Sequence, residues 1–173
     1  MPESRWRIEP LALADCEELG RVHVSVWREA YAGIMPDEYL AGLSPQQFAE
    51  RWRQRLGDQG SSDLGTTLVA TDAAAEIVGF VSAGPSRDDD VPTEWELYAI
   101  NLLARTHGTG LADKLLGRAL GDRGATLWVA ADNRRARAFY ARHGFVPDGA
   151  HKEHPGSGAP EIRMLRSRWR PAW

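Results

Sequence analysis

The sequence predicts an α/β protein, of the mixed α+β kind, with one central sheet that carries helices on both faces. Segments with strand and helix periodicity alternate irregularly: a strand, helices, three strands, a helix, a strand, a helix and two strands. The 173 residues are enough for one compact domain over 1–173, and 43% of them are hydrophobic, as in ordinary globular proteins. We therefore expect a mixed sheet in a single domain.

Strand and helix signals in the N-terminal part come from apolar periodicity and from typical end residues. Asp15 is a favoured first residue of a helix, and Ser44 followed by Pro45 is the usual N-cap and first-turn pair. A tight turn after Thr71 joins two strands into a hairpin. The expected elements are a strand over 5–9, helices over 15–31, 37–41 and 46–56, and strands over 66–71 and 76–83.

The C-terminal part alternates strands and helices more regularly. Gly144 stands where a helix typically ends, because glycine adopts the left-handed conformation that closes a last turn. The expected elements are a strand over 94–103, a helix over 111–120, a strand over 125–130, a helix over 134–143, a strand beginning at 145 and a strand over 161–168.

A glycine-rich turn joins the strand over 94–103 to the next helix. Such a turn gathers unpaired backbone N–H groups and the positive end of a helix dipole at one point, where they bind phosphate. Gly108 and Gly110 permit positive φ and keep Cβ atoms away from a ligand. The turn therefore predicts a site for a phosphorylated cofactor.

Two common phosphate-binding motifs do not fit this turn. A Walker loop needs Lys followed by Ser or Thr after its last glycine, whereas Leu111 and Ala112 follow Gly110. A dinucleotide fingerprint needs three glycines in the first strand–helix unit, and this turn has two and lies in the second half of the chain. A glycine pair alone is also compatible with a plain turn.

A second motif follows on the helix over 134–143. The turn and this helix together resemble the GNAT superfamily of acyl-CoA-dependent N-acyltransferases, and the resemblance extends from Glu96 to Phe145. The turn matches the family pattern R/Q-x-x-G-x-G/A, and the helix matches N-x-x-A-x-x-F-Y-x-x-x-G-F. The matching residues are Arg105, Gly108, Gly110, Asn133, Ala136, Phe139, Tyr140, Gly144 and Phe145.

The resemblance implies a sheet, mostly antiparallel, that is splayed between two parallel strands, with acetyl-CoA as co-substrate. It implies that Leu102 and Leu103 pair with the pantetheine arm through their backbone, and that the Leu102 N–H polarises the thioester carbonyl. Asn133 would bind pantetheine amides, cap its helix, or both. The other cofactor-binding residues that it implies are Arg105, His107, Gly108, Thr109, Gly110, Leu111, Ala112 and Phe139.

Acetyl transfer to an amine needs a base and an acid. The pKa of an aliphatic ammonium is about 10, so a carboxylate that binds it and takes its proton would assist attack. Glu96 is our candidate base; Glu94 points to the same face, and an exposed strand glutamate without a catalytic role remains the alternative. Tyr140 is our candidate acid for the thiolate, and a core tyrosine is the alternative.

The acceptor is expected to bind against the N-terminal helices. Trp27, Tyr31 and Met35 would wall its pocket, with core packing as the competing interpretation. Glu94 and Asn101, the latter at an expected strand bulge, would face the acceptor.

Charged residues elsewhere carry weaker signals. The acidic run over 88–90 would attract an amine or simply form a solvated loop. The arginines of the last strand and tail alternate as on an exposed strand; they are Arg163, Arg166, Arg168 and Arg170.

Composition and motifs exclude several classes of protein. The net charge of −3 gives no attraction to nucleic acid, and no apolar run is long enough to span a membrane. Cys16 is the only cysteine and the start does not resemble a signal peptide, so we expect a cytoplasmic protein. His151 and His154 lie in a Gly/Pro-rich segment without further metal ligands, so no metal is expected.

The function that follows is N-acetylation of a primary amine by direct attack in a ternary complex. We expect a small-molecule acceptor and a monomer or homodimer. A protein or peptide N-terminus is the alternative acceptor. A non-catalytic acyl-CoA-binding regulatory module and, more remotely, a nucleic-acid binder are the alternatives of other classes.

Overall fold

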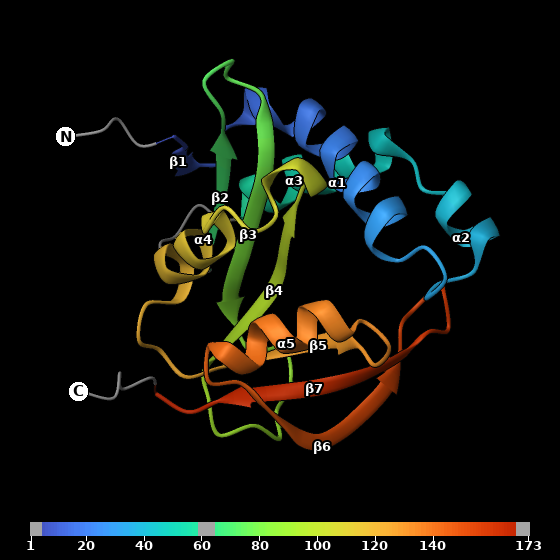
Figure 1. Cartoon of the computed structure of the whole chain (residues 1–173), viewed down its shortest axis with the longest axis vertical. Helices are drawn as coiled ribbons and strands as arrows, with labels where there is room; N and C mark the ends of the chain where they lie inside the picture. Colours follow the sequence, from blue (N-terminus) through green and yellow to red (C-terminus); the bar gives the residue numbers. More distant parts are fainter. Residues whose placement is uncertain (1–4, 59–64, 169–173) are drawn as a thin grey trace.

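In the computed structural model, which describes residues 5–58 and 65–168, one sheet of seven strands runs through the molecule (Figure 1). Its spatial order is β1-β2-β3-β4-β5-β7-β6. The strands are β1 (Arg7–Pro10), β2 (Thr66–Thr71), β3 (Ile77–Pro85), β4 (Trp95–Leu102), β5 (Ala125–Ala130), β6 (Val146–Glu153) and β7 (Pro160–Arg166). The helices are α1 (Cys16–Ala30), α2 (Asp37–Ala41), α3 (Pro45–Asp58), α4 (Leu111–Leu120) and α5 (Arg134–Arg142), with short 3-10 turns over Leu13–Asp15 and Ala104–Thr106.

The predicted class and order of elements are confirmed, and helix caps explain several of the bounds. The Ser44 hydroxyl accepts a hydrogen bond from the Gln47 N–H at 3.3 Å, and the Asn133 side chain accepts one from the Ala136 N–H at 3.1 Å. Asp15 is the N-cap residue of α1, as expected, but its side chain makes no cap hydrogen bond to the first turn of that helix. A 3-10 turn precedes α1, and the Asp15 carboxylate accepts instead from the Ala12 N–H at 2.9 Å.

The sheet is split between its two central strands. β4 and β5 are parallel and pair only at Glu96 with Thr126 and at Leu97 with Leu127, whereas every other pair of neighbouring strands is antiparallel. Beyond Leu97, β4 keeps only β3 as its partner, and β5 keeps only β7. The two facing edges therefore diverge and leave backbone groups unpaired, which confirms the expected splayed sheet.

The bulge in β4 is not at Asn101, where it was expected. Ser82 pairs with Ala99 and Ala83 with Leu97, so Tyr98 is the extra residue. Asn101 lies in the regular register, opposite Phe80. The bulge thus falls at the point where the parallel pairing ends.

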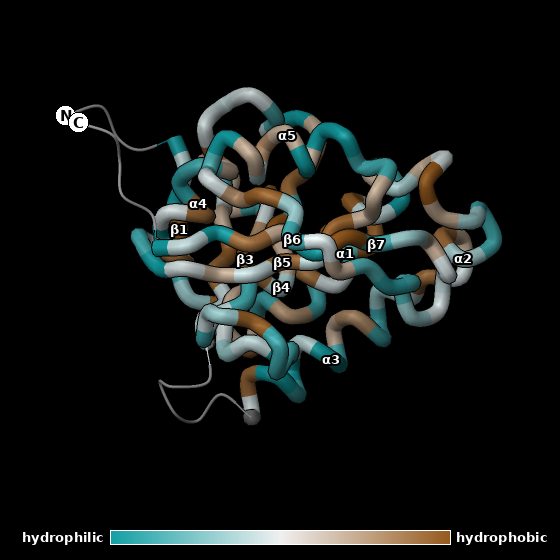
Figure 2. The backbone as a smooth tube through the Cα atoms, turned by 90° about the horizontal axis from the view of Figure 1, so that it is seen from below, coloured by the Kyte–Doolittle hydropathy of each residue, from teal (hydrophilic) through white to brown (hydrophobic). Residues whose placement is uncertain are grey.

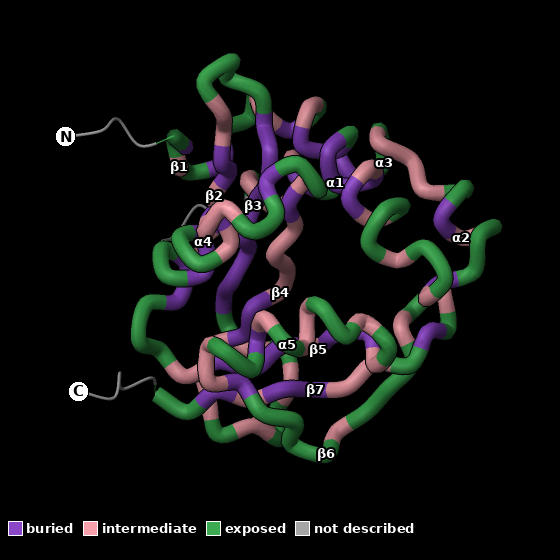
Figure 3. Tube along the Cα trace, in the orientation of Figure 1, coloured by how far each residue is buried: buried purple, intermediate pink, exposed green. Residues whose placement is uncertain are grey.

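Two apolar cores lie on the two faces of the sheet. α4 and α5 bury Leu111, Leu115 and Tyr140 against one face, and α1 and α3 bury Leu19 and Trp52 against the other. Figure 2 shows α3 and α4 on opposite sides of the strands. β3 is buried along almost its whole length, whereas β6 is exposed at the edge (Figure 3). The two central strands are therefore held by these cores over the part of their length that precedes the gap.

Two arginines of the last strand are buried, which corrects the expectation of an exposed row. The Arg163 guanidinium contacts the carboxylates of Asp90 and Asp148 at 2.6 Å and that of Asp88 at 3.4 Å. Arg166 donates to the carbonyls of Gly121 and Arg123. The acidic run is therefore held by a buried cation. Arg168 is exposed, and Arg170 lies outside the described residues.

His23 on α1 is a buried histidine without polar partners. Its side chain is 7% exposed and packs among aromatic rings, the nearest being Phe48 with 4.2 Å between ring centroids. Neither ring nitrogen has a hydrogen-bond partner among the described residues. Burial, and to a lesser extent the charge of Arg51, lowers the pKa of His23 from 6.5 to about 3.

We expect His23 to destabilise the fold in acid. The unfolded chain takes up a proton near pH 6.5, whereas the folded chain does so only near pH 3, so stability present above pH 6.5 is lost as the pH falls. Between pH 6.5 and pH 5, the free energy of unfolding of the wild type should fall by about 2 kcal/mol more than that of His23→Phe. Urea unfolding at several pH values measures this, with His151→Gln on the exposed edge as control; equal losses in wild type and His23→Phe would contradict it.

None of the helices among the described residues is long and apolar enough to cross a membrane.

Candidate active site

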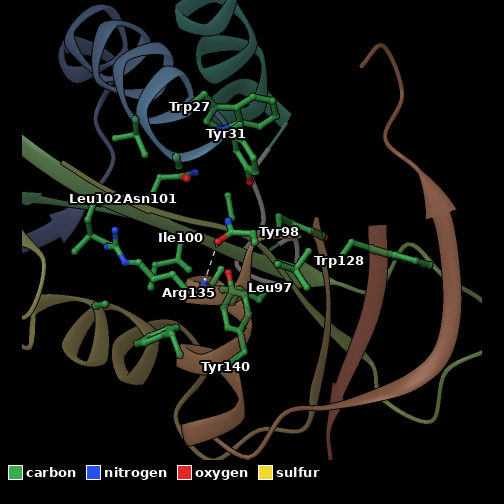
Figure 4. Close-up of a pocket in the computed structure, with 18 of the residues that line it drawn as sticks. Trp27, Tyr31, Leu97, Tyr98, Ile100, Asn101, Leu102, Trp128, Arg135 and Tyr140 are labelled. Atoms are coloured by element: carbon green, nitrogen blue, oxygen red, sulfur yellow. Dashed lines mark hydrogen bonds between the residues drawn. The ribbon is translucent and has the colours of Figure 1, made fainter. Parts of the chain in front are cut away.

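A cavity of about 990 Å³ opens where β4 and β5 diverge. β4 forms its floor, Trp27 of α1 and Tyr31 directly after α1 lie on one side, and Arg135 and Tyr140 of α5 lie on the other (Figure 4). The turn before α4 closes one end, and the β5–β7 part of the sheet closes the other with Trp128. The cavity thus connects the two motifs recognised in the sequence with helix α1.

The glycine turn has the geometry of an anion site. Gly108 and Gly110 have φ of 74° and 81°, and a Cβ on either would meet no atom within 4 Å. The N–H groups of Gly108, Gly110, Leu111 and Ala112 have no partner within the described part of the chain. These four amides are therefore free for a ligand near the start of α4, where the helix dipole favours negative charge.

Two of the six predicted amides of this turn are not available. The His107 N–H donates to the Ala104 carbonyl at 3.0 Å, and the Thr109 N–H donates to the Thr106 carbonyl at 3.4 Å. Both close the turn itself, so the prediction that they bind the cofactor through their amides is wrong. The His107 side chain instead places Nε2 3.1 Å from the Leu102 carbonyl oxygen, and this fixes the end of β4.

Arg105 is also corrected as a cofactor-binding residue. Its guanidinium pairs with Asp72 at 2.7 Å and with Glu76 at 3.1 Å, both at the turn between β2 and β3, and it does not line the cavity. The hydrogen bond from Arg105 lowers the pKa of Asp72. Arg105 therefore links the segment before the glycine turn to the turn between β2 and β3.

Arg135 is the cation that the sequence analysis missed. It lies in the first turn of α5, lines the cavity, and is close enough to His107 to lower the pKa of that imidazole, after the larger effect of burial. The only signal was its place within the motif that begins at Asn133.

Leu102 and Leu103, at the end of β4, direct their backbone N–H groups to opposite sides. The Leu103 N–H donates to the Val78 carbonyl at 2.9 Å, so it faces β3 and is not free for a ligand. Leu102 lies opposite Gly79, in the next position of the antiparallel ladder, where backbone groups point away from the partner strand. The Leu102 N–H therefore faces the gap toward β5, and the expected role of Leu103 is corrected.

Glu96 does not reach the cavity. Its side chain is 1% exposed, and its carboxylate accepts hydrogen bonds from the Arg87 backbone N–H and guanidinium. Glu96 belongs to the stretch where β4 and β5 are still paired, so its place precedes the opening. It is a structural ion-pair partner, and our assignment of the base to Glu96 is wrong.

Glu94 lies still further from the cavity. It precedes the first residue of β4, is exposed, and accepts a hydrogen bond from the Ser86 N–H through its backbone carbonyl. The prediction that Glu94 contacts the acceptor is therefore wrong as well.

Tyr140 lies on the cavity wall with its side chain 8% exposed. No hydrogen bond from a described residue contributes to the pKa of its hydroxyl. Burial raises the pKa of Tyr140 above its ordinary value, so the phenol stays protonated and able to donate. Asn133 and Phe139 line the same wall; Asn133 accepts from Ala136 through its side-chain oxygen and leaves its NH₂ group for the cavity.

The acceptor side combines both interpretations of its aromatic residues. Trp27, Tyr31 and Met35 line the cavity, and they also belong to a cluster that packs against α2. Asn101 faces the cavity from β4 (Figure 4). Burial, and next the negative charge of Glu161, raises the pKa of Tyr31 to about 12.

A further group of polar residues reaches the cavity from the last strands. Lys152, His154 and Glu161 line it together with Trp128 of β5. No motif marks these residues in the sequence. They reach the site because β7 pairs with β5 and β6 with β7, so the end of the chain lies beside the gap.

These features define a class of protein. Free amides at a helix start, a strand edge with unpaired backbone and a protonated tyrosine line one end of a cavity, and aromatic and charged side chains line the other. The site is that of an α/β transferase with one arm for a phosphorylated acyl carrier and one for an acceptor.

Comparisons with known proteins specify the class. The model of the acetyltransferase (GNAT) domain family matches residues 63–147. An uncharacterized N-acetyltransferase of Bacillus subtilis is 29% identical over 169 residues, which cover 90% of this chain and 93% of that protein. The chain thus matches the GNAT acetyltransferase family over residues 63–147 and is similar to an N-acetyltransferase over 90% of its length.

Solved structures support the fold. The PaiA N-acetyltransferase of Thermoplasma acidophilum, in complex with coenzyme A, superposes with a TM-score of 0.72 at 21% identity and covers 95% of this chain and 99% of its own. A spermidine N-acetyltransferase chimera from Vibrio cholerae superposes with a TM-score of 0.64 at 20% identity, with 95% and 96% covered.

Within residues 5–58 and 65–168, no group of three or more His, Cys, Asp or Glu side chains is placed to hold a metal ion.

Proposed function

We propose that this protein transfers the acetyl group of acetyl-CoA to a small primary amine by direct attack in a ternary complex. One observation carries the proposal. The free amides of the glycine turn, the gap-facing edge of β4 and the Tyr140 hydroxyl border the same cavity, which continues to an acceptor end under α1.

The cofactor end fits a pyrophosphate and a pantetheine arm. The space over Gly108 and Gly110 is open, the amides there are unpaired, and Arg135 adds a positive charge beside them. Acetyl-CoA supplies an activated thioester when bound. The Asn133 amide group and the free edge of β4 are placed to hydrogen-bond the amides of the arm.

The Leu102 N–H is placed to donate to the thioester carbonyl as charge develops on its oxygen. A backbone donor of this kind contributes about 3 kcal/mol to transition-state stabilisation. Tyr140 donates its hydroxyl hydrogen toward the sulfur. Its raised pKa keeps that hydrogen in place over the working range of pH.

The acceptor end favours a small molecule. Trp27, Tyr31 and Met35 cover it from the N-terminal helices, and His154 covers it from the segment after β6. Such a covered pocket suits a compact amine, whereas a protein N-terminus needs an open groove. A spermidine N-acetyltransferase chimera is among the structural neighbours, which supports a small amine as the acceptor.

The test is release of free thiol from acetyl-CoA with a panel of primary amines and N-terminal peptides, with the products identified by mass. We expect turnover with small amines and little with peptides. Turnover only with peptides would overturn the small-molecule acceptor, and tight coenzyme A binding without turnover across the panel would favour a regulatory module.

Three expectations from the sequence belong to this proposal. The chain acts as one catalytic domain over 1–173, as a monomer or homodimer, in the cytoplasm. Size-exclusion chromatography with light scattering and cell fractionation test the last two.

A further inference from the structure

We propose that Glu161 is the carboxylate that binds the acceptor ammonium and accepts its proton, so that the site selects cationic primary amines. This inference rests on the proposed function, because it assigns a residue to the acceptor end of the same cavity.

Glu161 is distinguished from the other acidic residues of the cavity. Of the described residues that line it, three have carboxylates: Glu29, Asp113 and Glu161. Glu29 is exposed, and Asp113, at the cofactor end, contacts the His143 imidazole at 2.9 Å. The Glu161 side chain is 12% exposed and accepts no hydrogen bond from the described residues. It is therefore the partly buried carboxylate of the cavity whose oxygens accept no hydrogen bond from the described residues, and such a group favours a cationic partner.

The wall around Glu161 already holds one ammonium group. Lys152 Nζ lies 4.0 Å from Glu161 Oε2 and 4.1 Å from the centre of the Trp128 ring. A carboxylate on one side and an aromatic face on the other are the two groups that bind alkylammonium ions. The 4.0 Å separation exceeds a hydrogen-bond distance, so the oxygens of Glu161 remain available to a second, substrate ammonium.

Glu161 also faces the route to the thioester. Glu161, Tyr31 and Tyr140 all line the cavity, the charge of Glu161 raises the pKa of Tyr31, and Tyr31 interacts electrostatically with Tyr140. Tyr31 and Tyr140 extend from opposite walls, with their hydroxyl groups directed toward the space between them (Figure 4). An amine held at Glu161 and Tyr31 therefore faces the carbonyl that Leu102 and Tyr140 position.

The surroundings adjust the basicity of Glu161. Burial raises its pKa above the ordinary value, and the charges of Lys152 on β6 and Arg87 after β3 oppose this effect. The other titratable groups that line the cavity near the acceptor end are Tyr31 directly after α1, Tyr140 of α5 and His154 after β6, and burial lowers the pKa of His154. A carboxylate of raised pKa takes a proton more readily from an ammonium.

Glu161 takes one proton from the ammonium, and the neutral nitrogen attacks the carbonyl carbon. The C–N bond forms, the C–S bond breaks, and the thiolate takes the second nitrogen proton by way of the Tyr140 hydroxyl. Glu161 then returns its proton to water, so each turnover yields the amide, a free thiol and one proton.

Glu161→Gln tests the proposal, because the amide keeps the size and removes the charge and the basicity. We expect acetyl-CoA affinity by calorimetry to stay unchanged, kcat/KM for the amine to fall by about 100-fold or more, and the acid limb of its pH profile to disappear. Lys152→Ala should move that limb to higher pH, since the lysine charge lowers the pKa of Glu161. Glu153→Gln, an exposed residue at the end of β6, is the control.

Each outcome separates this proposal from the proposed function. If the wild type binds no acetyl-CoA or acetylates no amine, the proposed function fails. If the wild type is active and Glu161→Gln keeps its kcat/KM and acid limb, or if the limb disappears in His154→Gln instead, only the role of Glu161 is overturned. Should Glu161→Gln not fold, an unmoved limb in Lys152→Ala overturns the role by itself.

Discussion

Gly110→Asp is expected to weaken coenzyme A binding by about 100-fold or more. Gly110 has φ of 81° and stands directly before the first residue of α4, where its amide and those of Leu111 and Ala112 are free. An aspartate there is strained by about 1 kcal/mol or more, and its carboxylate competes with the diphosphate for the same amides.

Isothermal calorimetry with coenzyme A measures this effect. Gly149→Asp is the matched control, because Gly149 also has positive φ and open space around it but lies on β6, away from the turn. Gly110→Ala retains the strain without the charge and should give an intermediate affinity. A Gly110→Asp protein that binds as the wild type does would show that the turn does not hold the diphosphate.

Tyr140→Phe is the second large effect that we expect. kcat should fall by about 100-fold while the affinity for acetyl-CoA changes by less than about twofold. The thiolate loses its proton or hydrogen-bond donor, whereas the aromatic packing of Tyr140 against Phe139 and Phe145 is retained by a phenylalanine ring. Burial and the neighbouring Tyr31, and no hydrogen bond, act on the hydroxyl, so the fold should tolerate its loss.

Steady-state kinetics with a good amine, together with calorimetry, separate the two quantities. Tyr39→Phe on α2 is a suitable control, because this tyrosine does not line the cavity. Since burial raises the pKa of Tyr140, the wild-type rate should show no loss from its ionisation below about pH 10. Unchanged kcat in Tyr140→Phe would exclude the acid role.

The cofactor half of the site was largely predictable from the sequence. A turn with Gly108 and Gly110 between a strand and a helix can adopt few backbone conformations. Positive φ and the start of a helix depend on residues close together in the chain, so they can be predicted locally. The bounds of α4 and β5 were predicted to the residue for the same reason. Within the turn, however, only the hydrogen bonds show that the amides of His107 and Thr109 are used internally.

The acceptor half could not be predicted in the same way. Glu96 and Glu94 were chosen as carboxylates of the strand that borders the expected gap, but the parallel pairing with β5 lasts through Leu97, and Glu96 is buried and paired with Arg87. Likewise, Leu102 and Leu103 are indistinguishable until the register with β3 shows which N–H is free. The alternation of side chains along a strand predicts the face of the sheet on which a residue lies, but it does not predict where two neighbouring strands separate.

The sequence alone determined the family motifs, the order of elements and the anion site at the start of α4, because these depend on residues that are close in the chain. Only the tertiary structure decided which side chains meet in the cavity. Glu161 and Lys152 lie beside Tyr31 because β7 pairs with β5 and β6 with β7, and Arg163 holds the acidic run over 88–90. These contacts join segments far apart in the chain, and strand pairing and core packing set them.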